Sequence, residues 1–419
     1  MKKSVRIACT IGLFIAEIMV LLLCITLDEL QSFIESSGWW IDLLSLITPI
    51  PILYAINYYL LAPGVYRIAC FVWHNTGHYN FYKKRYSVII SNAIDWLVCL
   101  KTHWGVVDQA AVMQNANTCE GLLALRASGK HSEKSEIYKQ AFRSIIDNAE
   151  EEGLPSKSLS MPTVVCTAMM LDLVAQEQKK SMNVIADYTV YEKMAKKLWS
   201  IRTESHGWGV YVAKTKDENC SLANTYWALR ALSKYSVGKT EAFRDYMKSI
   251  YEHSRQGKFG FSFGDNPRLI VSSMYLSLYY HMDLETRKKI SEAYDHKAAI
   301  DFVYKKLVLQ NTQLEVETLS GMDIAGKGGP LKAPWNHVTI GYAIEALLLA
   351  YQNKDLNILK TDLLFIWINK TIDKNVKTAD GGLCYYIPHN MEHNNKGIYT
   401  FPTAYLVQGL SQIYDCARK

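Results

Sequence analysis

The chain has 419 residues, of which 49% are hydrophobic and 21% are charged. That much apolar sequence excludes a disordered or collagen-like chain. Its 46 Lys and Arg against 40 Asp and Glu give a formal net charge of +6, spread along the sequence. Nucleic acid is therefore not expected as a partner, because phosphate binding needs clustered basic side chains. The nine cysteines form no Cys-x-x-Cys pair, which favours free thiols in a reducing compartment.

Two apolar stretches lie close to the N-terminus. Residues 7–27 contain one charged residue, Glu17, and residues 43–62 contain none. At about 1.5 Å per residue, each can cross a hydrocarbon core of roughly 30 Å, so we predict a transmembrane hairpin within residues 1–66. A signal peptide is the alternative for the first stretch. The stretch is long for one, and no small-x-small cleavage site follows it.

Basic residues set the expected orientation of this hairpin. They occur before the first stretch, in residues 1–6, and after the second, at residues 83–85, but not in the connecting residues 28–42. The positive-inside rule therefore places both flanks in the cytoplasm, with the chain anchored in the inner membrane. Glu17, in mid-span, is expected to bond to the partner helix or to a second copy, so a homo-oligomer through the hairpin is one expected partner.

One pattern recurs six times over residues 86–419. A helix with an apolar stripe leads to a turn rich in glycine and aromatic residues, and a second, almost wholly apolar helix opens with a hydroxyl residue that we predict to be its N-cap. The six hydroxyl residues are Thr118, Thr163, Thr225, Ser273, Thr339 and Thr403. Repeated helical hairpins predict an all-α fold, and we expect a closed (α/α)6 toroid, with buried inner helices around a central cavity. An open solenoid is the alternative.

The repeats resemble those of the terpenoid cyclase and protein prenyltransferase superfamily. The likeness rests on Trp-Leu…Trp-Gly and Gly-Gly-x-x-Tyr turns, each followed by Thr and a small or aromatic residue on the next helix. It implies a toroid whose cavity takes a hydrophobic, isoprenoid ligand. The Asp-rich cyclase motifs are missing, and His337, Thr339 and Pro402 stand where the zinc ligands of the prenyltransferases would be. Proline cannot bind a metal, so we expect neither a metal nor a cofactor.

A second pattern, Cys384-x4-His389-x3-His393, has residue types that suit zinc. Histidines at a surface beside a buried cysteine are the more ordinary interpretation of this spacing.

Three residues are the candidates for acid–base chemistry. Asp380 precedes a Gly-Gly turn and Asp323 lies in the long fifth turn, where both would face the mouth of the cavity. A carboxyl buried among aromatic rings could act as a general acid. His337, at the start of an inner helix, could be a neutral base, because the helix N-terminus disfavours its protonation.

Aromatic residues recur at the turns and on the inner helices. They could line an apolar cavity for an isoprenoid or acyl chain, or stabilise a carbocation; packing between helices is the alternative. The candidate cavity residues are Trp208, Trp227, Phe261, Tyr275, Trp335, Tyr342, Tyr385 and Tyr405.

The sequence therefore predicts a membrane-anchored, cyclase-like toroid with the bilayer and a hydrophobic small molecule as partners. Whether it is an enzyme stays open. One alternative is a non-catalytic toroid that acts as a sensor, scaffold or effector through its hairpin, for example in bacterial defence. A further alternative is a sugar-processing toroid with paired carboxylates.

Overall fold

The computed structural model describes most of the chain from residue 79 onward. The described residues are 79–99, 114–132, 134–156, 161–179, 185, 187–204, 207–212, 220–310, 316–319, 331–334, 336–379, 382–385 and 400–416, with 10–13, 15, 58, 61 and 64. The predicted hairpin helices at 7–27 and 43–62 fall almost entirely outside them. Among the described helices, none combines the length and the apolar character that a bilayer span requires. The chain divides into two compact units, Met1–Tyr82 and Lys83–Lys419.

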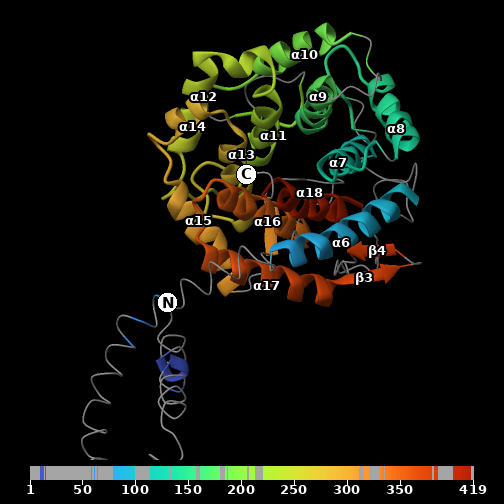
Figure 1. Ribbon diagram of the computed structural model, residues 1–419. Coiled ribbons are helices and arrows are strands. Elements are labelled where there is room, and N and C mark those ends of the chain that lie inside the picture. Colours follow the sequence, from blue (N-terminus) through green and yellow to red (C-terminus); the bar gives the residue numbers. More distant parts are fainter. Residues whose placement is uncertain are drawn as a thin grey trace, which may run out of the picture. The chain divides into compact units, whose positions relative to one another are not determined.

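Helices alternate between an outer and an inner layer in the second unit (Figure 1). The outer helices are α6 (Tyr79–Cys99), α8 (Ser135–Asp147), α10 (Thr189–Ser200), α12 (Glu241–Glu252), α14 (Leu284–Ile290) with α15 (His296–Tyr304), and α17 (Ile358–Asn375). The inner helices are α7 (Gln114–Ala127), α9 (Val164–Lys179), α11 (Leu222–Leu232), α13 (Leu269–His281), α16 (Asn336–Gln352) and α18 (Thr400–Cys416).

The inner helices form a closed ring. In chain order each packs against the next, from α7 through α9, α11, α13 and α16 to α18, and α18 packs back against α7. This last contact excludes the open solenoid, because the two ends of a solenoid would not meet. The predicted α/α toroid is therefore confirmed.

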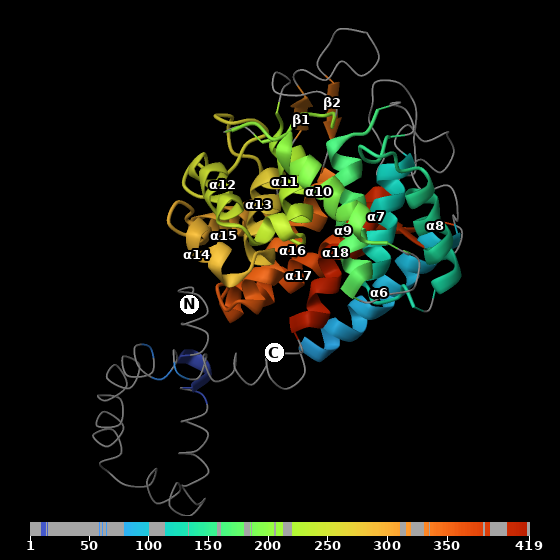
Figure 2. The ribbon, with the colours of Figure 1, turned by 90° about the horizontal axis from the view of Figure 1, so that it is seen from above.

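Two short antiparallel hairpins lie in the connections that lead into the last two inner helices. Strands β1 (Val316–Leu319) and β2 (Leu331–Pro334) precede α16, while β3 (Val376–Ala379) and β4 (Gly382–Tyr385) precede α18. Figure 2 shows β1 and β2 projecting beyond one end of the ring.

The two layers differ in composition as the sequence predicts. In α9, residues on every side of the helix are buried, including Met170, Leu171 and Asp172, each with no exposed surface. In the outer helix α12 only one side is buried, through residues such as Phe243 and Met247. A helix that is apolar all round must lie inside, whereas an amphipathic helix can cover it.

Of the six hydroxyl residues predicted as N-caps, five lie inside their helices, so the N-cap prediction is wrong for Thr118, Thr225, Ser273, Thr339 and Thr403. Thr163 does cap α9, since its Oγ1 accepts the Cys166 N–H at 3.3 Å. In α11, however, the cap is Ser221, which accepts the Asn224 N–H, and Thr225 lies inside the helix. The N-cap prediction is therefore wrong for Thr225.

Thr225 instead fixes the preceding turn to the inner helix. Its Oγ1 accepts the Trp208 N–H at 3.1 Å. At Gly207, φ is +83°, and an added Cβ would lie 1.8 Å from this hydroxyl, so only glycine fits. The same bond recurs from the N–H of Leu154 to Thr167 and from the N–H of Phe259 to Ser272. Thr167 and Ser272 are not among the six predicted residues; they and Thr225 each satisfy a buried backbone donor of the preceding turn.

Helices α16 and α18 approach each other most closely at two glycines. A Cβ at Gly341 would lie 2.6 Å from the backbone carbonyl carbon of Tyr405, and one at Gly409 would lie 2.5 Å from the Gly341 carbonyl oxygen. The two backbones are therefore in direct contact here, which leaves no room for a side chain.

Candidate functional site

The predicted acid–base residues lie mostly beyond what the structure describes. Asp323 and Asp380 are outside the described residues. His337 lies in the first turn of α16, where only its backbone is described. Their proposed chemistry therefore stays a prediction.

Two of the predicted cavity aromatics make packing contacts between the layers. Trp208 donates its indole N–H to the Leu198 carbonyl at 2.8 Å and contacts the Tyr246 ring edge-on. Tyr275 stacks on Phe259 with ring centroids 4.2 Å apart. These contacts bind each turn to its helices, which is the alternative role that the sequence left open.

Three other predicted residues sit elsewhere. Phe261 is half-buried, with the Arg268 guanidinium 5.9 Å from its ring centroid. Tyr385 ends β4, where only its backbone is described, and Trp335 lies outside the described residues.

The remaining three predicted aromatics meet inside the ring. Trp227 on α11 and Tyr405 on α18 have ring centroids 6.4 Å apart, although these two helices are not neighbours in the ring. Tyr342 on α16 lies 4.7 Å from Tyr405, and Tyr226 on α11 lies 5.8 Å from Tyr342. We call Tyr226, Trp227, Tyr342 and Tyr405 the axial aromatic cluster; all four are buried. At this depth the rings themselves occupy the interior.

A carboxyl group that the sequence analysis missed lies against this cluster. Glu120 on α7 accepts a hydrogen bond from the Tyr405 hydroxyl at its Oε1, at 2.8 Å. Its other oxygen, Oε2, is buried and has no hydrogen-bond partner among the described residues. Burial raises the pKa of Glu120 to about 8, against the opposing effect of the Tyr405 bond. The carboxyl is therefore protonated at neutral pH, as are the general acids of known enzymes.

A second buried carboxyl, Glu345, lies one turn beyond Tyr342 on α16. Its Oε1 is 2.9 Å from Nε2 of His281 and 4.0 Å from Nη1 of Arg230. Burial opposes ionisation, but the His281 bond and the Arg230 charge outweigh it and hold the pKa of Glu345 below its ordinary value. The ring interior therefore contains one protonated and one ionised carboxyl.

Glu345 belongs to a larger buried ionic network, which we define as Asp172, Arg230, Lys234, His281 and Glu345. Arg230 donates to Asp172 at 2.9 Å and to the Tyr226 hydroxyl at 2.8 Å, and Lys234 pairs with Asp172. The network joins α9, α11, α13 and α16. Its Lys234 and His281 side chains are 23% and 30% exposed, so it reaches solvent there.

The sequence contains a pattern that could have identified the buried charged residues. Glu120, Asp172, Arg230 and Glu345 are charged residues within otherwise apolar inner helices. A charge on a helix that must be buried needs a partner. The pattern marks such positions as unusual but does not say which helix supplies the partner.

The stability of the protein should depend on pH through Glu120. Between its ordinary pKa and about 8, the native carboxyl keeps a proton that the unfolded chain releases, so stability falls as the pH rises. The full difference is on the order of 5 kcal/mol. We expect Glu120→Gln, which cannot ionise, to be more stable than the wild type at pH 8.5 but not at pH 5, in urea unfolding at both pH values.

Glu292→Gln is the matched control, because that carboxylate is exposed and paired with Lys248 at 2.8 Å. A wild type and a Glu120→Gln variant with the same pH dependence would contradict the assignment.

No group of three or more His, Cys, Asp or Glu that could hold a metal was found among the described residues. Of the Cys-His-His pattern, His389 and His393 lie outside them.

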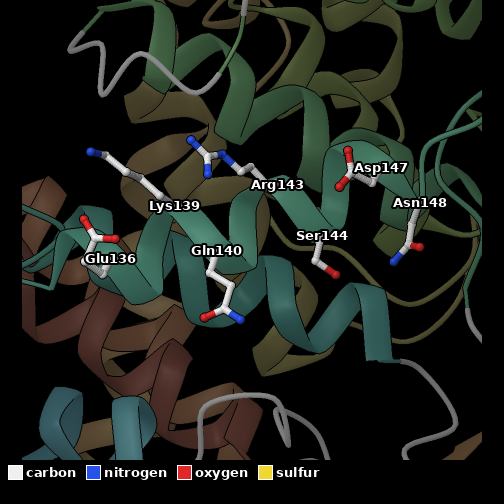
Figure 3. Close-up of a pocket in the computed structure, with 7 residues that line it drawn as sticks. All are labelled: Glu136, Lys139, Gln140, Arg143, Ser144, Asp147 and Asn148. Carbon is white, nitrogen blue, oxygen red and sulfur yellow. The ribbon is translucent and has the colours of Figure 1, made fainter.

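One surface pocket lies on the outer helix α8, away from the axial aromatic cluster. Figure 3 shows its lining side chains fanning out from that helix. The lining consists of Glu136, Lys139, Gln140, Arg143, Ser144, Asp147 and Asn148. Because a single helix and the residue after it supply all of these groups, the pocket is a groove on the surface, separate from the ring interior.

Comparison with known proteins finds similarity in solved structures alone: no family model matches the chain, and no curated protein does. One similar structure is an inactive variant, with two aspartates replaced by asparagine, of the α-1,6-mannanase GH76A of Salegentibacter sp. HEL1_6 in complex with α-1,6-mannotriose. It has a TM-score of 0.50 and 12% identity, and the match covers 78% of this chain and 99% of that one.

Two further structures are similar at a lower level. They are the same mannanase without the substitutions, with a TM-score of 0.48 and 12% identity, and a family 105 glycoside hydrolase of C. acetobutylicum, with a TM-score of 0.48 and 10% identity. The matches cover 79% of this chain and 99% of each of those chains.

At 12% identity the first match shows the fold alone. This chain is thus similar to α/α toroid glycoside hydrolases. The toroid that we predicted from the repeats is confirmed. The narrower prediction, a terpenoid cyclase or protein prenyltransferase relationship, is not.

Proposed function

We propose that this chain is a carbohydrate-active toroid that binds a sugar beside the axial aromatic cluster, with Glu120 as the general acid. The observation that carries the proposal is the Glu120 carboxyl itself. It is buried against the axial aromatic cluster, it is protonated at neutral pH, and its Oε2 has no partner among the described residues. A buried polar atom without a partner is costly, and a ligand oxygen would remove that cost.

The groups around Glu120 suit glycoside chemistry. A glycosidase needs one carboxylic acid to protonate the leaving oxygen and one carboxylate to act as base or nucleophile. Glu120 and Glu345 are both buried and have pKa values shifted in opposite directions, as the acid and the base of a glycosidase do.

The mannanase similarity supports the choice of probe. That protein has the same fold and was solved with α-1,6-mannotriose. We therefore take α-linked oligosaccharides as the first ligands to test on this chain.

The experiment measures the hydrolysis of α-1,6-mannotriose and related α-linked oligosaccharides by chromatography of the products, and binding by calorimetry. We expect the wild type to hydrolyse at least one of them and Glu120→Gln to lower kcat by about 100-fold or more, because general acid catalysis contributes that much. Trp227→Ala should weaken binding.

Glu292→Gln, an exposed carboxylate, should match the wild type and is the control. A wild type that neither binds nor hydrolyses any member of the panel would rule the proposal out. So would a Glu120→Gln variant with full activity.

A second candidate is the membrane-anchored toroid with an isoprenoid ligand. The apolar residues 7–27 and 43–62 and the axial aromatic cluster support it. In this function the chain would lie at the inner membrane with its toroid in the cytoplasm, and could associate with a second copy through the hairpin.

Mass spectrometry of lipids that co-purify with the detergent-solubilised protein separates the candidates. A bound polyprenyl species would favour the isoprenoid function. If the protein has no bound lipid and no activity on sugars, the result would favour the non-catalytic sensor or scaffold.

A further inference from the structure

Two outer helices, α6 and α17, lie side by side where the ring closes. The Tyr86 hydroxyl on α6 donates to the Phe365 carbonyl on α17 at 3.5 Å, and the two rings are 6.2 Å apart. Both residues are buried. Because Tyr86 and Phe365 face inward, the opposite sides of the two helices face outward; Figure 1 shows both helices at the periphery.

These outward sides carry apolar residues that the fold does not cover. Leu363 and Ile366 on α17 are 41% and 42% exposed, and Val88 on α6 is 56% exposed. Leu363 and Ile366 are three residues apart and so lie on one face of the helix. Leu359, four residues before Leu363, is half-buried and extends the same face.

Lysines flank these apolar residues along the same helix faces. Lys84 lies four residues before Val88, Lys370 lies four residues after Ile366, and both lysines are exposed. A spacing of four keeps each lysine on the face of its apolar neighbour. We call Lys84, Val88, Leu359, Leu363, Ile366 and Lys370 the basic–apolar face.

Two acidic groups of the neighbouring region already have partners. Asp301 pairs with Lys360 at 2.5 Å, and Asp95, further along α6, pairs with Lys134 at 2.7 Å. Asp362, four residues before Ile366, is half-buried on the same side of α17, so the two lysines of the face, Lys84 and Lys370, exceed its single negative charge.

We propose that the basic–apolar face lies on the surface of an anionic lipid bilayer. Its valine, leucines and isoleucine would enter the interface, and its lysines would contact the lipid phosphates. Exposed apolar residues between lysines on a helix are typical of interfacial membrane contacts. Three exposed apolar side chains are few for a stable protein interface, whereas a bilayer needs no shape complementarity.

The sequence before α6 and at its start favours the same partner. The apolar residues 43–62 end shortly before α6 begins at Tyr79, and three consecutive basic residues, 83–85, follow within α6. Basic residues close to an apolar span are typical of contact with anionic lipid headgroups. The proposal concerns a surface and is independent of the sugar site.

Photo-crosslinking of the full-length chain in liposomes tests this. A benzophenone amino acid replaces Ile366 or Val88, in vesicles of phosphatidylglycerol or of phosphatidylcholine. We expect lipid adducts at both positions in anionic vesicles, at least several-fold above those at two control positions. The controls are Leu284 on α14 and Val190 on α10, which are also exposed and apolar, at 76% and 50%.

The charge requirement is tested separately. Lys84→Gln with Lys370→Gln should lower the adduct yield at position 366 several-fold in anionic vesicles and change it little in neutral ones, with an unchanged circular dichroism spectrum. Equal adducts at Leu284 and Ile366 would overturn the proposal. Adducts between two protein chains at Ile366 would also overturn it, in favour of a second copy as the partner. Sugar hydrolysis in detergent would be unaffected by either result.

Discussion

Replacing Asp172 with alanine is expected to lower the free energy of unfolding by about 3–5 kcal/mol, since this is the usual cost of removing one partner of a buried ion pair. Asp172 has no exposed surface and binds both Arg230 and Lys234. Without it, Arg230 remains inside the ring with only Glu345 to balance it, whereas Lys234, whose pKa burial lowers to about 7, can lose its proton. Urea unfolding followed by circular dichroism at neutral pH measures the loss.

Glu292→Ala is the matched control, because it breaks the exposed pair with Lys248. Exposed pairs contribute little, so this variant should unfold like the wild type. An Asp172→Ala variant as stable as the control would mean that solvent reaches the buried ionic network and screens it.

Gly341→Ala is expected to cost a comparable amount, about 2–4 kcal/mol, because overpacking forces the backbone to move. The added methyl group would lie 2.6 Å from the backbone of Tyr405 and would push α16 and α18 apart. Since the Tyr405 bond opposes the rise in the Glu120 pKa, loosening that bond should enlarge the pH dependence assigned to Glu120 in the same variant. Thermal unfolding at pH 5 and pH 8.5 measures both effects.

Gly129→Ala is the control that separates the effect of steric crowding at Gly341 from the effect of backbone strain. Gly129 has a φ of +72° but nothing within 4 Å of an added Cβ, so its substitution should cost only about 1–2 kcal/mol. If the Gly341 variant lost no more stability than this control, the backbone contact between α16 and α18 would be looser than the structure shows.

Much of the proposed site escaped the sequence analysis. The candidates Asp323, Asp380 and His337 were chosen because they lie at turns and helix starts, where catalytic residues are common. The groups that meet inside the ring lie in the middle of apolar helices instead. Of the predicted residues, Trp227, Tyr342 and Tyr405 belong to the axial aromatic cluster, whereas Trp208 and Tyr275 make packing contacts between helices.

The hydroxyl residues show how a correct pattern can have another cause. Thr225 recurs at the expected place in its repeat, but it binds the N–H of Trp208 instead of capping its own helix. Both roles need a hydroxyl close to a helix start, so the sequence could not distinguish them.

Helix type, repeat number and the division into inner and outer helices could be derived from the sequence, because they depend on periodicity within a single segment. Ring closure and the interior could not. The Tyr405 hydroxyl reaches Glu120 across 285 residues, and Arg230 reaches Asp172 across 58. Which charges and rings meet depends on how each helix is rotated about its own axis against its neighbours. Only the packing of all six inner helices together determines that rotation.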